Sequence, residues 1–253
     1  MVLQELDRYL RGLLPIAELE PADTSLNGIQ VDRSSEPVHR AAFAVDACME
    51  SFARAKSLDA QVLVVHHGLF WGKPLSLTGS HYARVKYLLN NDIALYAVHL
   101  PLDLHPLYGN NTAMAEALGL EESEPFGVYH GVKIGRMGRL ARPATLDELL
   151  VRLGMERESC LAVLPFGPPQ IQSVGVVSGG GARDVLQAIG AGLDLYITGD
   201  AMHEIYHLCL EERINVVCGG HYQTEVWGVR RLASRVAEDL GIETVFIDVP
   251  TGL

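Results

Sequence analysis

The chain is poor in clustered cysteines, long apolar runs and basic residues. Its four cysteines, Cys48, Cys160, Cys209 and Cys218, are scattered and form no Cys-x-x-Cys pair. Isolated cysteines in apolar surroundings are reduced core residues more often than redox centres or thiolate zinc ligands, and we adopt that interpretation. No apolar run approaches the roughly 20 residues that a membrane helix needs, so the sequence predicts no membrane association.

Basic residues are outnumbered by acidic ones, 20 to 31, which gives a formal net charge of −11. Nonspecific binding to duplex nucleic acid depends on Lys and Arg at the phosphates, so this balance argues against a nucleic-acid partner. It leaves open a small phosphorylated substrate bound through metal. The first seven residues carry acids where a secretory signal carries bases, so we expect a cytoplasmic protein.

Short apolar segments rich in β-formers alternate with amphipathic segments along most of the 253 residues. Strands are predicted at 41–45, 62–65, 93–98, 173–177, 194–198, 214–217 and 243–248. Helices are predicted at 2–14, 48–57, 81–91, 111–119, 145–154, 182–190, 201–212 and 225–240. The helix at 145–154 opens on the capping box Thr145-Leu146-Asp147-Glu148, and the Gly-rich stretch 125–142 is interpreted as strand and connector. This alternation predicts an α/β fold with parallel sheets covered by helices.

The two halves of the chain look like copies of one α/β unit. Asp46 precedes a predicted helix and stands 21 residues before His67, and Gly179 stands in the same relation to Asp200. We therefore predict two similar lobes, at about 1–125 and 126–253, which exchange segments if the boundary is not a clean cut. Equivalent strand ends of such lobes would face a shared cleft.

The predicted strand 62–65 runs directly into His66 and His67. In open α/β sheets, ligands bind at the carboxyl ends of the strands. For an isolated histidine pair, one core and one surface residue is the simpler interpretation. The pair becomes a candidate site only if the pleat breaks at the strand end, so that both imidazoles converge.

Other strands of the predicted sheets also end in imidazole and carboxylate groups. His99 and Asp103 follow one strand and His221 and Glu225 follow another, each as His-x-x-x-acid. Polar side chains at the ends of buried strands are costly unless paired or metal-bound. Imidazole with carboxylate suits Zn, Mn, Fe or Ni, and the set is large enough for two ions that hold a hydrolytic water. His105 and His99 are candidates to move protons.

Three further features leave alternatives open. Ser178-Gly179-Gly180-Gly181 lies between a strand and a helix, where it would serve either as a phosphate cradle or as a tight turn. Asp200 and His203 are either groups near the same cleft or a helix cap and a bystander. No Gly-x-Ser-x-Gly elbow is present, so covalent catalysis is the weaker expectation.

Six segments, in this order, resemble the GTP cyclohydrolase I type 2 homolog family, also called the Nif-three-like family. They are Asn27-Gly-Ile-Gln-Val31, Val65-His-His-Gly-Leu-Phe-Trp71, His99-Leu-Pro-Leu-Asp103 with Gly109-Asn-Asn111, Ser178-Gly-Gly-Gly-Ala-Arg-Asp184, Thr198-Gly-Asp200 and Gly219-Gly-His-Tyr-Gln-Thr-Glu225. The resemblance is to the short bacterial members and spans nearly the whole chain.

The resemblance implies two α/β lobes around a dinuclear metal site, in a ring-shaped homohexamer. His67 and Asp103 would hold one divalent ion, His66 and His221 the other, and Glu225 would bridge them. His99 matches a position close to the site.

The function expected from these observations is metal-dependent hydrolysis of a nucleotide or related small molecule. The alternative is a metal-binding, metal-trafficking or regulatory protein without turnover, because the same five ligands serve both. The family's GTP cyclohydrolase label transfers only weakly.

Overall fold

The computed structural model describes residues 1–253, which form two compact units. The first unit comprises Met1–His105 and Gly228–Val249, and the second comprises Pro106–Trp227 and Pro250–Leu253. The chain passes from the second unit back to the first within helix α10 (His221–Leu240). The units thus divide the chain earlier than the predicted boundary at residues 125 and 126, which lies inside strand β5 (Leu120–Tyr129), and the last strand of the chain joins the first unit.

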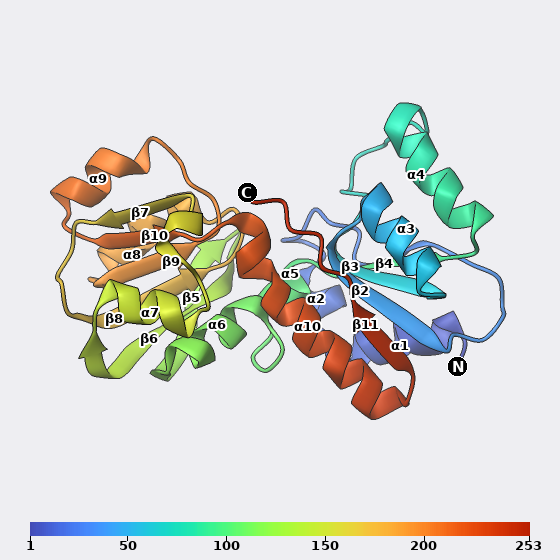
Figure 1. Ribbon diagram of the computed structural model, residues 1–253, viewed down its shortest axis with the longest axis horizontal. Helices are drawn as coiled ribbons and strands as arrows, with labels where there is room; N and C mark the ends of the chain where they lie inside the picture. The colour runs from blue at the N-terminus through green and yellow to red at the C-terminus, as the bar shows by residue number, and fades with distance from the viewer. The chain divides into compact units, whose positions relative to one another are not determined.

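The first unit contains a five-stranded sheet in the order β1-β4-β3-β2-β11 (Figure 1). Its strands are β1 (Gly28–Val31), β2 (Arg40–Asp46), β3 (Val62–His67), β4 (Ala94–Ala97) and β11 (Glu243–Phe246). Its other helices are α1 (Leu3–Leu13), α2 (Ile16–Leu19), α3 (Met49–Ser57), α4 (Gly79–Asn90) and α5 (Leu100–Asp103). All neighbouring strands are parallel except β1, which pairs antiparallel with β4.

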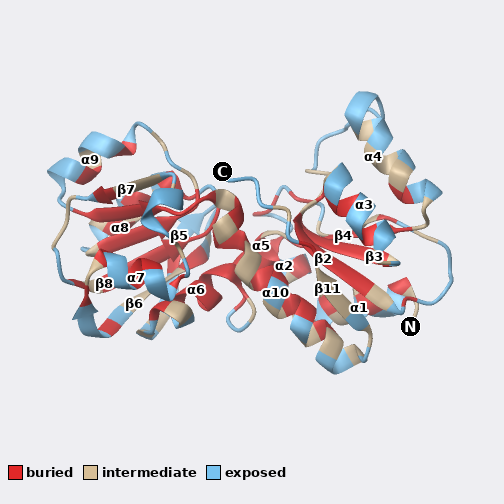
Figure 2. Cartoon of the chain, in the orientation of Figure 1, coloured by how far each residue is buried: buried red, intermediate tan, exposed pale blue.

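The central strands β2, β3 and β4 are buried on both faces, as their continuous apolar runs predict. One face packs Leu63 and Val65 of β3 against Phe52 of α3 and Leu88 of α4. Other strand residues, among them Phe43 and Tyr96, are also fully buried. Figure 2 shows β2 and β3 coloured almost entirely as buried. A sheet buried in this way fixes the ends of its strands, where the polar residues lie.

The second unit contains a six-stranded sheet in the order β5-β6-β8-β9-β10-β7. Its remaining strands are β6 (Val132–Ala144), β7 (Ala162–Pro165), β8 (Ile171–Val177), β9 (Leu195–Thr198) and β10 (Asn215–Cys218). Its helices are α6 (Asn110–Leu118), α7 (Leu146–Arg152), α8 (Val185–Gly190), α9 (Ile205–Glu211) and the start of α10, with short 3-10 turns η1 (Arg157–Ser159) and η2 (Ala182–Asp184). Leu149 and Leu150 of α7 pack with Val174 and Val176 of β8 in the core of this unit.

The two sheets share a four-strand arrangement. In the first unit β2, β3 and β4 are parallel neighbours and β1 is antiparallel to β4; in the second, β8, β9 and β10 are parallel neighbours and β7 is antiparallel to β10. Strands β1 to β4 and β7 to β10 therefore follow the same chain order and pairing. The prediction of two similar α/β lobes is confirmed at this level.

Several predicted elements differ from those in the structure. The sheets are mixed rather than parallel, because β1 and β7 pair antiparallel with their neighbours, and neither strand was predicted. The stretch 125–142 belongs to a long antiparallel hairpin of β5 and β6. Glycines gave this stretch its irregular appearance, and one of them, Gly135, lies too close to Val176 O for any side chain. Helix α9 begins at Ile205, later than predicted, and α10 begins at His221, earlier than predicted.

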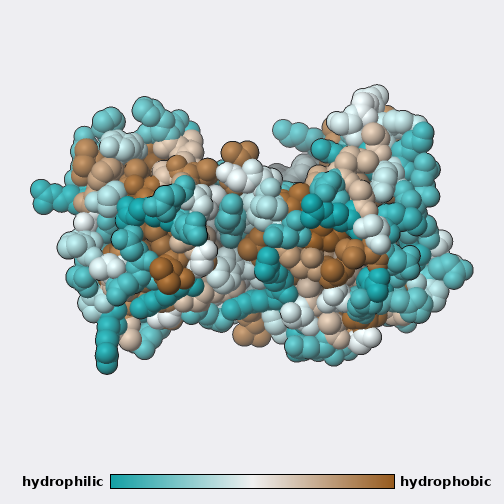
Figure 3. Space-filling model, in the orientation of Figure 1, coloured by the Kyte–Doolittle hydropathy of each residue, from teal (hydrophilic) through white to brown (hydrophobic).

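No helix combines the length and the apolarity that a bilayer crossing requires. Figure 3 shows hydrophilic side chains over much of the face in view, with smaller hydrophobic areas between them. The strands coloured as buried in Figure 2 carry most of the apolar residues of the core.

Candidate metal centre

In the first unit, His66 and His67 are the last two residues of β3. The strand pairing continues to their level, with Asp46 opposite His67, so the predicted break of the pleat does not occur at this point. Their ring centroids nevertheless lie 4.7 Å apart. His66 is fully buried and His67 is partly exposed, so the two imidazoles form one group rather than a core residue and an unrelated surface residue.

Each imidazole of this group is fixed through its Nδ1 atom. His66 Nδ1 lies 3.0 Å from the carbonyl oxygen of Val98, and His67 Nδ1 lies 2.9 Å from Asp46 Oδ1. A carbonyl oxygen only accepts hydrogen bonds, and so does an ionised carboxylate, so Nδ1 carries the proton in both rings. The Nε2 atom of each neutral ring is then the metal-binding nitrogen.

His99 joins this group directly after β4. Nitrogen atoms of His66, His67 and His99 lie within 4.8 Å of one another, a grouping that could hold one ion. His99 Nδ1 lies 2.9 Å from Asp23 Oδ1. Asp23 is buried, which by itself raises its pKa, but the hydrogen bond and charge of His99, with donors from Asn27 and Ser25, outweigh burial and lower the pKa.

Asp103 brings a carboxylate to the same group. It ends α5, the short helix that begins after His99, and it is buried. Its Oδ2 atom lies 3.5 Å from His66 Nε2. The first unit therefore places three imidazoles and one carboxylate together, and these include three of the five predicted ligands.

The second unit places the other two predicted ligands one helical turn apart. Because α10 begins at His221 rather than at residue 225, His221 and Glu225 lie on one face of the helix. His221 Nε2 is 3.2 Å from Glu225 Oε1, and His221 Nδ1 is 2.8 Å from Asp200 Oδ1. Burial lowers the pKa of His221, but hydrogen bonds and charge from Glu225 and Asp200 outweigh it and raise the pKa to about 9.

The glycine loop after β8 packs directly on this pair. Gly179 has φ of +62°, and a Cβ atom built on it would lie 2.1 Å from Glu225 Oε1 and 3.1 Å from His221 Nε2. Its backbone N–H donates to Thr224 Oγ1, and that of Ser178 donates to Asn111 Oδ1. These two N–H groups are thus used within the chain, and the absence of a side chain at Gly179 makes room for Glu225.

The donor set fits a divalent transition metal in both units. Imidazole Nε2 atoms held by a carboxylate or carbonyl at Nδ1 are typical of metal-binding histidines, because the second partner fixes the tautomer and the ring orientation. Buried carboxylates beside them match the hard component of such a site. The missing side chain of Gly179 provides the space in which Glu225 and His221 meet.

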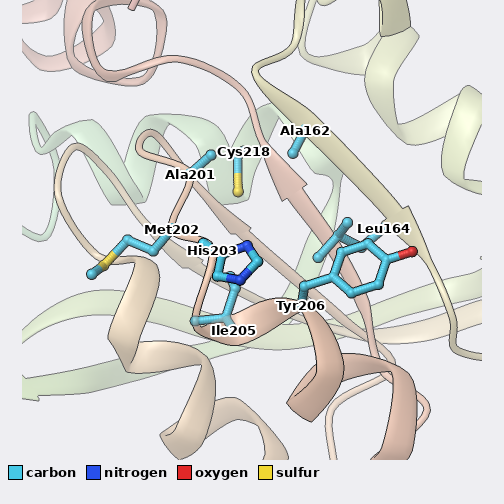
Figure 4. Close-up of a pocket in the computed structure, with 8 residues that line it drawn as sticks. All are labelled: Ala162, Leu164, Ala201, Met202, His203, Ile205, Tyr206 and Cys218. Carbon is cyan, nitrogen blue, oxygen red and sulfur yellow. The ribbon is translucent and has the colours of Figure 1, made fainter.

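Two residues singled out from the sequence, His105 and His203, lie outside these histidine and carboxylate groups. His105 Nε2 is 3.1 Å from the carbonyl oxygen of Leu13 at the end of α1, and burial lowers its pKa, with that hydrogen bond opposing the effect. His203 lines a small, mainly apolar pocket of about 220 Å³ in the second unit, where Figure 4 shows it beside Ile205 and near Cys218.

Of the residues that orient the imidazoles, sequence reasoning named Asp200 as one alternative near the cleft, and it assigned no such role to Asp46 or Asp23. Asp46 and Asp200 each stand 21 residues before the histidine they contact. The recurrence of that spacing was the available signal. Nothing in the sequence marked Asp23, which lies 76 residues from His99.

Comparison with known proteins gives matches along the whole chain. The model of the family Duf34/NIF3 (NGG1p interacting factor 3) matches residues 1–252. A protein of Archaeoglobus fulgidus named GTP cyclohydrolase 1 type 2 homolog is 46% identical, and one of Treponema pallidum with the same name is 42% identical; both matches cover 100% of each chain. The crystal structure of TTHA1606 from Thermus thermophilus is 38% identical, with a TM-score of 0.88 over 100% of both chains.

Proposed function

Since the chain belongs to the Duf34/NIF3 family, we propose that it is a dinuclear metal-dependent hydrolase acting on a nucleotide or a related small molecule. The observation that carries the proposal is the orientation of the imidazoles. His66, His67 and His221 each have Nδ1 directed at an acceptor, which assigns Nε2 to metal binding. The proposed ligands are His66, His67, Asp103, His221 and Glu225.

In this proposal the groups of the two units act on one pair of divalent ions, which are Zn, Fe, Mn or Ni. When bound, such a pair lowers the pKa of water and stabilises negative charge that develops on the substrate. Asp46 and Asp200 hold His67 and His221 in the metal-binding tautomer. Glu225 would hold both ions, and the absence of a side chain at Gly179 leaves room for its carboxylate.

His99 has a different part in the proposal. Its Nδ1 is directed at Asp23, and this contact fixes the orientation of the ring. Its ring lies 5.1 Å from that of His66 and 5.8 Å from that of His67, centroid to centroid. We assign to His99 the transfer of a proton at Nε2 during hydrolysis.

Metal analysis combined with two matched variants tests the proposal. We expect two ions per chain after reconstitution and metal-dependent hydrolysis of at least one member of a nucleotide panel that includes GTP. Glu225→Gln should retain the fold and lose turnover, whereas Glu238→Gln, an exposed change on the same helix, should retain both. Normal turnover by Glu225→Gln would overturn the assignment.

A metal-trafficking protein would give a different result in the same experiment. It would bind the ions, release them rapidly to a chelator and hydrolyse no nucleotide in the panel. The ring-shaped homohexamer stays a prediction of the resemblance. Light scattering should then report a mass six times the 27.6 kDa of one chain.

A further inference from the structure

The first unit contains a second feature next to the histidine group, a pocket of about 480 Å³. Its volume lies within the range typical of small-ligand pockets. Residues 20–27, between α2 and β1, form one side, and Trp71, Gly72 and Lys73, after β3, form the other. None of the five proposed metal ligands lines it.

The pocket is held in shape by the side chain of Gln30. Its Nε2 donates to the carbonyl oxygens of Leu26 and Phe70, and its Oε1 accepts from the N–H groups of Leu69 and Phe70. One carboxamide thus ties the two sides of the pocket together. The backbone of Leu26 adds a further hydrogen bond to Phe70 O, 3.0 Å long.

Trp71 is shared by this pocket and the histidine group. Its ring lies 5.0 Å from that of His99 in an edge-to-face arrangement and 6.1 Å from that of His67. The indole N–H donates to Gly68 O, so the donor is already used and the orientation of the ring is fixed. What Trp71 offers a ligand is therefore its aromatic face.

Ser25 supplies an unused polar group in the pocket wall. The residue is only 5% exposed, and its Oγ atom has no hydrogen-bond partner. A buried hydroxyl without a partner is costly, and a ligand atom at hydrogen-bond distance would remove that cost. Asp23, in contrast, is already engaged by His99, Ser25 N–H, Asn27 and Leu100 N–H.

Lys73 is the only cationic side chain that lines the pocket, and it is exposed. Leu26 adds an apolar side chain that is 53% exposed. The pocket thus combines the aromatic face of Trp71, the apolar side chain of Leu26, the hydroxyls of Thr24 and Ser25 and the cation of Lys73, and its lining also contains the carboxylates of Glu20 and Asp23. A planar nitrogen heterocycle that carries one anionic group presents the matching chemistry.

We propose that this pocket binds the base of a nucleotide, which stacks on Trp71 and hydrogen bonds to Ser25 Oγ, while Lys73 contacts its phosphate. The inference rests on the proposed function in that it places the substrate beside His99. Because the pocket residues are not the metal ligands, base binding is measurable without metal.

Fluorescence of Trp71 tests the proposal directly. The chain has two tryptophans, so a Trp227→Phe variant leaves Trp71 as the only indole reporter. In the presence of EDTA, adenosine 5′-monophosphate should quench this fluorescence saturably. Ribose 5-phosphate, which lacks the base, should not quench it. Absence of quenching by the nucleotide, or equal quenching by ribose 5-phosphate, would overturn the proposal.

Variants measured by calorimetry separate the three contacts. Trp71→Leu should weaken binding of adenosine 5′-monophosphate by about 5- to 100-fold, the range that loss of base stacking covers. Lys73→Ala should weaken it by about two- to five-fold, an effect that disappears at high salt, whereas Lys56→Ala, an exposed charge on α3, should leave it unchanged. Parent affinity in Trp71→Leu would overturn the stacking role.

Ser25→Ala gives a signature that a merely structural role would not produce. Removal of an unpartnered buried hydroxyl should leave Tm unchanged or raise it, while affinity for the nucleotide falls several-fold. A lower Tm with unchanged affinity would contradict the assignment of Ser25. Metal content separates this proposal from the proposed function. Unchanged metal binding by Trp71→Leu together with lost nucleotide binding would support the pocket and leave the hydrolase proposal untouched. Failure of the parent to bind metal would contradict the hydrolase proposal and leave the pocket untouched.

Discussion

Replacement of Gly179 by alanine should disable the centre through Glu225. Gly179 has φ of +62°, and an alanine there costs about 1–2 kcal/mol of backbone strain. In addition, the new Cβ would lie 2.1 Å from Glu225 Oε1, far inside contact distance, and Glu225 is 3% exposed, which leaves its carboxylate little room to move. Both the loop and the carboxylate must therefore shift.

Two glycines of the same unit isolate the effect of that contact. Gly192 has φ of +65° with nothing within 4 Å of a built Cβ, so Gly192→Ala carries the backbone strain without the clash. For Gly180 a built Cβ would lie 3.6 Å from Asp200 Oδ2, an ordinary contact. We expect Gly192→Ala to lower Tm by about 2–4 °C per kcal/mol of strain and to leave metal affinity intact.

Competition with a chromogenic chelator measures the Zn²⁺ affinity of each glycine variant relative to the parent. Gly179→Ala should bind Zn²⁺ about 10- to 100-fold more weakly than the parent. Mutation of residues that only hydrogen bond to a metal ligand already has effects of this size, and here a ligand itself is displaced. Gly180→Ala and Gly192→Ala should match the parent. Parent affinity in Gly179→Ala, at whatever Tm, would refute the argument that the missing side chain makes room for the ligands.

Other parts of the molecule give three further predictions. Asp46→Asn should weaken metal binding by about 10- to 100-fold by releasing the His67 tautomer, and an unaltered affinity would contradict that role. Thr145→Ala, which removes the cap of α7, should lower the free energy of unfolding by about 1 kcal/mol in urea titration without changing metal content. Burial raises the pKa of Cys209 to about 11 and that of Cys218 to about 12. Iodoacetamide should therefore label these thiols at pH 8 only after unfolding, and the rate of labelling should increase as the pH rises. Rapid labelling of the native chain at pH 8, detected by mass spectrometry, would contradict this prediction.

The parts of the fold that could be predicted from the sequence are those with strong periodicity. The run at Val62–Val65 and the capping box at Thr145 carry their own structural signal, and β3 and α7 lie where they were expected. Strands β1 and β7 are four residues each and are set by pairing with β4 and β10, which no local pattern encodes. The stretch 125–142 indicated a strand, but not the antiparallel pairing of β6 with β8.

For the centre, residue types at strand ends predicted the groups that come together within each unit, but not their supports. His66 and Asp103 lie within 3.5 Å because two consecutive strands are neighbours in the sheet. The acceptor of His66 is a backbone carbonyl, Val98 O, which has no sequence signature. His105 was included for its residue type alone, and its contact with the end of α1 is a property of tertiary packing.

The position of β11 has a consequence for synthesis on the ribosome. This strand, Glu243–Phe246, pairs with β2 and completes the sheet of the first unit, although residues 106–227 of the second unit are translated between the two strands. Until it emerges, β2 remains an open edge, the kind of surface that invites pairing with another chain. The sheet of the first unit is thus completed only after residues 106–227 of the second unit have been translated, and β2 keeps an unpaired edge during that interval.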